Sequence, residues 1–230
     1  RGHRAEIHCA GKEGRIMLAA RVVSLLIGYI FGMFVSGFFL GKFKHVDLRE
    51  KGSGNVGTTN TARVLGLKYG AITLLCDCLK PVLASLVVWL IFGRAYAGHI
   101  RLLILYASFG AVLGHDFPAF MKFKGGKGVA TSVGLILLCF PQAFPICAVL
   151  FFSAVGITRY VSLGSILAAV GLGAQAIVMG YLGWLFYPAG NVGEAVVIAE
   201  IISVLVIILH RSNIARLKNG TENKFSLHKK

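Results

Sequence analysis

The chain has 230 residues, of which 56% are hydrophobic and 14% charged, and its mean hydropathy is +0.75. A soluble domain of this length rarely reaches such values, so the composition favours a protein embedded in a lipid bilayer. The formal charge is +15, but the basic side chains lie between long apolar runs, which argues against a nucleic-acid partner and favours contact with anionic lipid.

Long apolar runs follow a polar lead. Residues 1–16 are polar and precede Met17, and we interpret them as an upstream extension or a cloning remnant. A helix needs roughly 20 apolar residues to cross a bilayer core about 30 Å thick. Five runs meet or approach this length: 17–41, 70–92, 100–120, 163–187 and the slightly shorter 194–210.

A sixth apolar run, 129–157, is interrupted by the sequence FPQAFP. Because Pro141 and Pro145 disfavour a continuous helix, we expect a turn between two helical limbs. The limbs form either two spans or a re-entrant hairpin, and the chain returns to the same side in both cases. We therefore predict an all-α polytopic membrane protein with seven transmembrane helices, or with five plus a short helical hairpin.

Basic residues are unevenly divided between the two sides of this predicted bundle. One side carries sixteen, in the loops and in the tail after His210, and the other carries about six. The positive-inside rule makes the first side cytoplasmic, which places the N-terminus outside and the C-terminus inside. We expect a helical membrane domain over 17–210, with cytosolic motif loops at 42–69, 115–128 and 158–165, and a basic cytosolic tail over 211–230.

The loop KGSGNVGTTNTARVLG, residues 51–66, is dense in glycines and hydrogen-bond donors. Its glycines allow backbone amides to converge on an anion, and its Ser, Thr and Asn side chains add donors or helix caps. Arg63 lies about one turn inside the following helix, where a guanidinium can pair with phosphate. We expect phosphate binding rather than a flexible surface loop, through Ser53, Gly54, Asn55, Gly57, Thr59, Asn60 and Arg63.

A second dense stretch, GHDFPAFMKFKGGKGVAT, covers residues 114–131. It is similar to a nucleotide-binding P-loop only superficially, because no glycine lies five residues before Gly126 and Gly128 stands where Ser or Thr should hold magnesium. We expect a phosphate cradle beside the membrane, formed by Lys124, Gly125, Gly126, Lys127 and Gly128. The five cysteines show no metal-ligand spacing, and we expect neither a metal nor a cofactor.

Further polar residues fall on the same predicted face. TRYVSLGSI offers Ser162 and Ser165, and HRSNIARLKNGTENK offers His210, Asn213 and Glu222, although a lone histidine at a helix end is more often a cap. Within the second span, Asp77 and Lys80 are one helical turn apart and form either a structural pair or a wall of the site. His115 is a further candidate for this wall.

The one-sided placement of these motifs bears on function. Two phosphate cradles at one interface of a lipid-embedded protein suit an enzyme whose substrates carry both phosphate and an acyl chain. The alternative is an organic-phosphate transporter or channel, which more often breaks its helices in mid-membrane.

These motifs resemble those of the bacterial integral-membrane acyl-phosphate:glycerol-3-phosphate acyltransferases. The similarity runs in order from about Met17 to Lys224 and rests on GSGNVGTTNTARVLG, GHDFPAFMKFKGGKGVAT, RYVSLGSI and HRSNIARLKNGTE; Thr58 stands where the family commonly has alanine. The resemblance implies a seven-helix enzyme that transfers an acyl group from acyl-phosphate to the 1-hydroxyl of glycerol 3-phosphate, giving lysophosphatidic acid and inorganic phosphate. It implies no protein partner beyond these substrates and the surrounding lipids.

The chemistry implied by this resemblance needs alignment and charge neutralisation more than a covalent nucleophile. Acyl-phosphate is an activated mixed anhydride, so direct transfer is sufficient. We expect Ser53, Arg63 and Lys127 to contact phosphate, with Lys124, Ser162 and Ser165 as further phosphate contacts. Asn213, His210 and Glu222 should complete the glycerol phosphate pocket, and the proton acceptor should be either the substrate phosphate or His210. The sequence lacks the His-x-x-x-x-Asp signature of the other large glycerolipid acyltransferase class.

Overall fold

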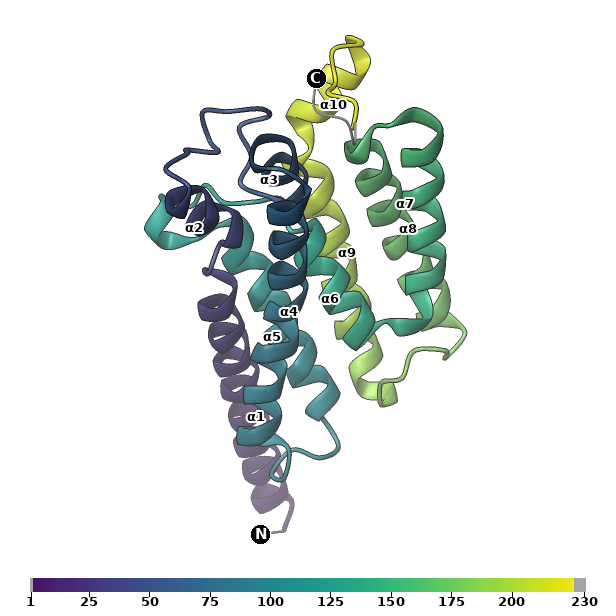
Figure 1. The fold of residues 1–230 in the computed structure, drawn as a ribbon. Coiled ribbons are helices and arrows are strands. Elements are labelled where there is room, and N and C mark those ends of the chain that lie inside the picture. Colours follow the sequence, from purple (N-terminus) through teal and green to yellow (C-terminus); the bar gives the residue numbers. More distant parts are fainter. Residues whose placement is uncertain (1, 226–230) are drawn as a thin grey trace.

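The computed structural model describes residues 2–225, with side chains described from Gly14 onward, and this part of the chain is helical without any strand (Figure 1). The ten α-helices are α1 (Gly2–Gly32), α2 (Ser36–Phe43), α3 (Thr58–Leu65), α4 (Leu67–Phe92), α5 (Ile100–Asp116), α6 (Val129–Cys139), α7 (Phe144–Thr158), α8 (Val161–Tyr181), α9 (Ala189–Leu209) and α10 (Arg211–Lys218). Two short 3₁₀ helices, η1 (Ala119–Met121) and η2 (Pro141–Ala143), interrupt the connections. The expected all-α class is confirmed.

Within the described residues, six segments are long and apolar enough to cross a bilayer. They are Gly14–Phe43, Leu67–Phe92, Ile100–Met121, Pro141–Thr158, Val161–Tyr181 and Ala189–Leu209. The run that contains the two prolines divides as expected, and η2 makes the turn between α6 and α7. The two limbs, α6 and α7, pack little against each other, because α6 packs chiefly against α4 while α7 packs chiefly against α8.

The first apolar run differs from the prediction. It is not one helix over 17–41: α1 continues back through the polar lead to Gly2 and ends at Gly32, and α2 begins separately at Ser36. The break is buried, since Val35 has no exposed surface and the Ser36 hydroxyl donates to Asp77 on α4 across 2.8 Å. Tertiary contacts at Val35 and Ser36 thus redirect a run that composition alone marks as continuous.

Glycines bring α1 and α5 into close contact. A Cβ added to Gly28 or Gly32 of α1 would collide with the α5 backbone, and one added to Gly110 or Gly114 of α5 would collide with α1. Both helices therefore carry a Gly-x-x-x-Gly face, the small-residue pattern by which membrane helices approach closely. The pair α1–α5 is the most extensively packed in the bundle.

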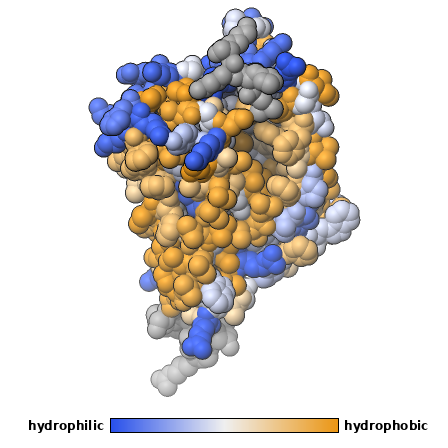
Figure 2. Space-filling view, in the orientation of Figure 1, coloured by the Kyte–Doolittle hydropathy of each residue, from blue (hydrophilic) through white to orange (hydrophobic). Residues whose placement is uncertain are grey.

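The bundle consists of two groups of helices joined by two further helices. α1, α4 and α5 form one group and α7 and α8 another, with α6 and α9 between them (Figure 1). The visible face of the molecule is a broad apolar band below a hydrophilic cap, which is formed at the end that carries α3 and α10 (Figure 2). This distribution is typical of a protein whose band lies in lipid and whose cap faces water.

Candidate functional site

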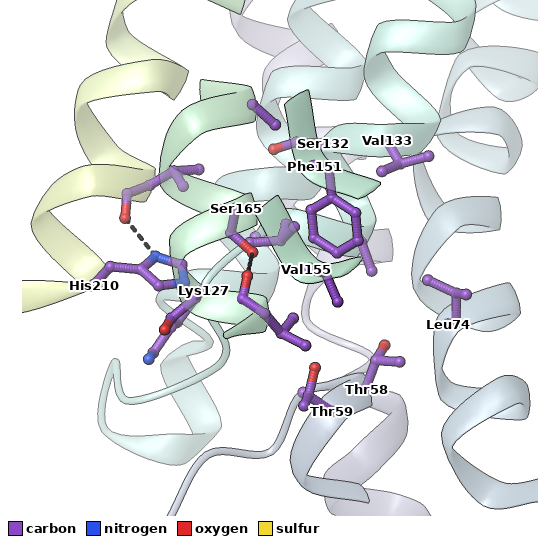
Figure 3. Close-up of a pocket in the computed structure, with 18 of the residues that line it drawn as sticks. Thr58, Thr59, Leu74, Lys127, Ser132, Val133, Phe151, Val155, Ser165 and His210 are labelled. Carbon is purple, nitrogen blue, oxygen red and sulfur yellow. Dashed lines mark hydrogen bonds between the residues drawn. The ribbon is translucent and has the colours of Figure 1, made fainter. Parts of the chain in front are cut away.

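A cavity of about 720 Å³ lies beneath the hydrophilic cap, between the two helix groups (Figure 3). The end nearest the cap is polar and is lined by Ser53, Thr58, Thr59, Arg63, His115, Lys127, Ser162, Ser165, His210, Asn213 and Glu222. The remainder is apolar and continues along α4, α6, α7, α8 and α9. Most of the predicted site residues therefore converge on one space, although they come from four separate stretches of sequence.

The apolar part of the cavity opens sideways. Leu74 on α4 and Phe152 on α7 both line the cavity, yet they are 44% and 69% exposed. Both residues belong to helices that are long and apolar enough to span the membrane. The opening between α4 and α7 therefore lies at the level of the apolar band.

Asn60 folds the first motif loop onto itself. Its side-chain amide donates to the carbonyls of Leu48, Lys51 and Asn55 across 2.8–3.1 Å, and its Oδ1 accepts from the Ser53 amide across 2.8 Å. Because these bonds occupy the amide and Asn60 is 2% exposed, its role differs from the expected phosphate contact. Asn60 instead holds Ser53 at the rim of the cavity.

The same loop delivers the start of α3 to the cavity. Asn55 accepts from the Gly57 amide across 2.7 Å, and α3 begins directly afterwards with Thr58 and Thr59 facing the cavity (Figure 3). The hydroxyl of Thr58 is buried without a partner within the described residues. Unpaired amides at a helix start favour an anion, so this end of the cavity can bind phosphate. Gly54, a predicted contact, lies outside the cavity lining.

Arg63 lies one turn further along α3 and is half-buried at the polar end. Burial lowers its pKa, and neighbouring Arg216 lowers it further, whereas Glu222 opposes both effects. Arginine nevertheless keeps its charge in proteins. Arg63 is therefore a desolvated cation beside the α3 start, as expected for a phosphate contact.

The second motif loop is built differently from the predicted cradle. The amides of Gly125 and Gly126 donate to the carbonyls of Asp116 and His115 across 3.0 and 2.9 Å, so they are not available to a substrate. Lys124 is exposed and lies outside the cavity lining. The prediction was therefore wrong for the Gly125 and Gly126 amides, whereas a phosphate contact by Lys124 stays a prediction. The loop delivers Lys127 and Gly128 to the cavity.

Glu222 organises the donors of the tail. Its side chain is 6% exposed; Oε1 accepts from Asn213 and Ser162 across 2.8 and 3.1 Å, and Oε2 accepts from Arg216 across 2.7 Å. A carboxylate repels phosphate, so Glu222 acts on the groups around it rather than as the expected phosphate ligand. Arg216, one of the basic residues of the predicted tail, joins the site through this contact with Glu222.

Lys127 completes this network. Its Nζ donates to Asn213 Oδ1. Burial lowers the pKa of Lys127 to about 8, nearby Arg216 lowers it too, and Glu222 raises it. The ammonium therefore remains charged at neutral pH but stands close to the point where it loses its proton.

His210 lies beside Lys127 at the end of α9 (Figure 3). Its Nδ1 donates to the Val206 carbonyl across 2.7 Å, which leaves Nε2 as an acceptor. Burial and the Lys127 charge lower the pKa of His210 to about 4, although Val206 and Glu222 oppose the shift. The ring is therefore neutral at physiological pH. Ser165, also in the lining, donates its hydroxyl to Val161 across 2.9 Å.

The three residues proposed as a wall of the site do not all reach the cavity. His115 lines the cavity, whereas Asp77 and Lys80 do not and lie behind it as a buried ion pair of 2.6 Å. Of the two alternatives left open for Asp77 and Lys80, the geometry favours the structural pair over a wall of the site. Asp116, which was not predicted, has a buried carboxylate without a partner among the described residues.

Comparisons with known proteins agree on one family. Residues 22–220 match the family described as glycerol-3-phosphate acyltransferase. The chain is 41% identical to the glycerol-3-phosphate acyltransferase of Enterococcus faecalis over 206 residues, covering 89% of this chain and 92% of that one. It is 39% identical to the enzyme of the same name from Trichlorobacter lovleyi over 197 residues, covering 86% and 93%.

Two solved structures share the fold. The glycerol 3-phosphate form of PlsY (YgiH), an integral membrane glycerol 3-phosphate acyltransferase, superposes with a TM-score of 0.75 at 32% identity, over 90% of this chain and 96% of that one. The lysophosphatidic acid form superposes with a TM-score of 0.72 at the same identity and coverage.

Proposed function

Because this chain belongs to the integral-membrane glycerol-3-phosphate acyltransferase family, it is a multi-pass membrane acyltransferase, and we propose that its acyl donor is acyl-phosphate and its product lysophosphatidic acid. The observation that carries this proposal is the single cavity that joins a polar end rich in phosphate donors to an apolar limb open toward lipid. A phosphate headgroup and an acyl chain need these two environments side by side.

Two donor groups in the polar end match two phosphates. The first combines Ser53, the start of α3 and Arg63, and the second is centred on Lys127 with Asn213. Each supplies a cation in a desolvated setting, where charge-assisted contacts to phosphate are strong. Acyl-phosphate and glycerol 3-phosphate each bring one phosphate, so the two groups account for both substrates. We assign the Lys127 group, which the tail completes through Asn213, to glycerol 3-phosphate.

The acyl chain enters from the membrane in this proposal. Its route is the opening between Leu74 and Phe152, and its binding surface is the apolar wall of α6, α8 and α9. Because the chain moves from lipid into an apolar limb, its methylene groups stay out of water, where exposure would cost about 0.8 kcal/mol for each of them. Glycerol 3-phosphate, which has no apolar tail, arrives through the polar end from water on the cytosolic side.

The reaction is direct transfer. The 1-hydroxyl oxygen of glycerol 3-phosphate forms a bond to the acyl carbonyl carbon, the carbon–oxygen bond to the donor phosphate breaks, and inorganic phosphate leaves with that electron pair. The hydroxyl proton passes to a phosphate oxygen. His210 orients the hydroxyl through Nε2, but a base whose pKa is about 4 is poorly matched to proton removal at neutral pH.

Within the described structure no serine or cysteine of the cavity is hydrogen-bonded to a histidine. Only Ser162 meets a carboxylate, and that carboxylate, Glu222, already accepts from Asn213 and Arg216. Ser162 donates to Glu222 and Ser165 to a backbone carbonyl, while the Cys78 thiol donates to the Ala130 carbonyl across 3.1 Å. Covalent catalysis by serine or cysteine requires a neighbouring base that removes its proton. The geometry therefore favours transfer without an acyl-enzyme.

Purified protein in lipid nanodiscs, supplied with acyl-phosphate and glycerol 3-phosphate, tests this function. We expect phosphate release that depends on both substrates and an equal amount of lysophosphatidic acid. Mass spectrometry of enzyme quenched during turnover should find an unmodified chain. An acyl group on Ser53 or any cysteine would contradict direct transfer, and glycerol 3-phosphate uptake into proteoliposomes without acylation would indicate a transporter.

A further inference from the structure

A buried polar cluster lies behind the cavity and joins α2, α4 and α5. Asp77 and Lys80 on α4 are 1% and 3% exposed and form the 2.6 Å ion pair. The Ser36 hydroxyl donates to the same carboxylate oxygen, and Lys80 Nζ lies 3.0 Å from His115 Nδ1. Ionisable groups inside a membrane helix are costly, so such a pair calls for an explanation beyond packing.

The contact between Lys80 and His115 has a defined direction. An ammonium group can only donate, so His115 Nδ1 accepts the hydrogen bond. A neutral imidazole that accepts at Nδ1 carries its proton at Nε2. Lys80, itself held by Asp77, thus selects both the tautomer and the orientation of the His115 ring.

The opposite edge of this ring supports the second motif loop. A Cβ added to Gly126 would collide with His115 Nε2, so the ring lies directly against the Gly126 backbone. The His115 and Asp116 carbonyls also accept from the Gly126 and Gly125 amides. A Cβ added to Gly128 would lie 2.8–2.9 Å from the Asp116 carboxylate. The second motif loop therefore packs against the last turn of α5.

We propose that the Asp77–Lys80 pair is a positioning device for the loop that carries Lys127. By holding the His115 ring beneath Gly126, the pair determines where Lys127 enters the cavity. It acts through His115 and does not touch the substrate. The inference depends on the proposed function, because it takes Lys127 as a phosphate contact.

Two double variants separate this role from simple packing: Asp77→Leu with Lys80→Met, and Asp77→Leu with Lys80→Gln. Both remove the two charges together, a replacement that buried ion pairs often tolerate. Met and Gln side chains have the same length, but only Gln can donate to His115 Nδ1. Thermal unfolding in detergent establishes that each variant folds.

The positioning role predicts a KM for glycerol 3-phosphate about tenfold higher in the Met variant than in the Gln variant, the equivalent of one hydrogen bond, with similar kcat. Equal KM values would overturn the proposal. Should the Met variant not fold, His115→Phe keeps a ring beneath Gly126 but cannot accept from Lys80, and an unchanged KM there would overturn it instead.

Nitrogen-15 NMR of histidine-labelled protein gives a readout that does not depend on catalysis. The His115 signal is identified by its loss in His115→Gln. We expect the Nε2–H tautomer in the parent and the Gln variant, and mixed tautomers in the Met variant. Identical spectra in parent and Met variant would overturn positioning by Lys80. Failure of the parent to acylate glycerol 3-phosphate would instead overturn the proposed function.

Discussion

Lys127 donates to the side chain of Asn213, which lies 86 residues further along the chain. This contact joins the loop before α6 to the tail helix α10 and places a half-buried ammonium at the polar end of the cavity. Glu222 holds Asn213 from the other side. The charge that we propose to meet a substrate phosphate is therefore positioned by the tail.

Activity should depend on the protonation of Lys127. Its pKa in the folded protein is about 8, below the ordinary value of 10.5, so the charge is present below pH 8 and is lost as the pH rises through 8. We expect KM for glycerol 3-phosphate to rise above pH 8, approaching tenfold per pH unit. Steady-state kinetics from pH 7 to 9.5 measures this. Lys127→Arg should show no such rise, since arginine stays charged; an identical rise in that variant would exclude Lys127 as its source.

The acid limb of the pH profile should belong to the substrate and not to His210. A pKa of about 4 keeps His210 neutral above pH 5, whereas a phosphate monoester takes up its second proton near pH 6. We expect kcat/KM to fall below about pH 6 both in the parent and in His210→Gln, although the variant is slower throughout. A profile that becomes flat in His210→Gln would make His210 the proton acceptor.

Asn60→Ala should damage both stability and activity. The substitution leaves the carbonyls that Asn60 now satisfies without their donor, at a cost of about 1–3 kcal/mol, and it releases the Ser53 amide. The unfolding temperature and the rate of acyl transfer should therefore both be lower in Asn60→Ala than in the parent. Arg63→Lys is the matched comparison: it should impair activity, because a point charge cannot reproduce the planar guanidinium, while leaving the unfolding temperature close to that of the parent.

Gly126→Ala and His115→Ala should be coupled. The alanine methyl at position 126 would collide with the His115 ring, so the single variant should raise KM for glycerol 3-phosphate. Removing the ring makes room for the methyl, and we expect the double variant to be less impaired than the two single effects combined. A double-mutant cycle measures this coupling, and strict additivity would show that the ring and the glycine act independently.

The apolar limb should determine the length of acyl chain that is accepted. Ala169 is buried on α8 and lines the cavity about one turn beyond Ser165. Ala169→Phe should lower kcat/KM for long-chain acyl-phosphates more than for short-chain ones, because the ring fills the space that distal methylenes occupy. The control Val170→Phe changes the next residue, which is 51% exposed on the outer surface. Equal loss for all chain lengths in Ala169→Phe would place the acyl chain elsewhere.

Amino-acid composition and hydrophobic pattern were sufficient to predict much of the fold and part of the site. Runs of about 20 apolar residues have no stable environment other than lipid or a protein core, so the spans near 70–92, 100–120 and 194–210 follow from hydropathy alone. The prolines of FPQAFP also made the turn between α6 and α7 predictable. Local chemistry likewise marked Ser53, Arg63, Lys127, His210 and Asn213, all of which line one cavity.

The remaining features depend on contacts between segments that are distant in sequence, and local sequence does not show which groups meet in the folded chain. The break between α1 and α2 follows from burial of Val35 and from a bond between Ser36 and Asp77, neither of which leaves a local signal. Gly125 and Gly126 look like phosphate donors in sequence, yet their amides face the end of α5, since a glycine equally serves close packing. Glu222 looks like a pocket residue in sequence, yet it accepts hydrogen bonds from Asn213 and Arg216, because the folded tail brings these donors to its carboxylate.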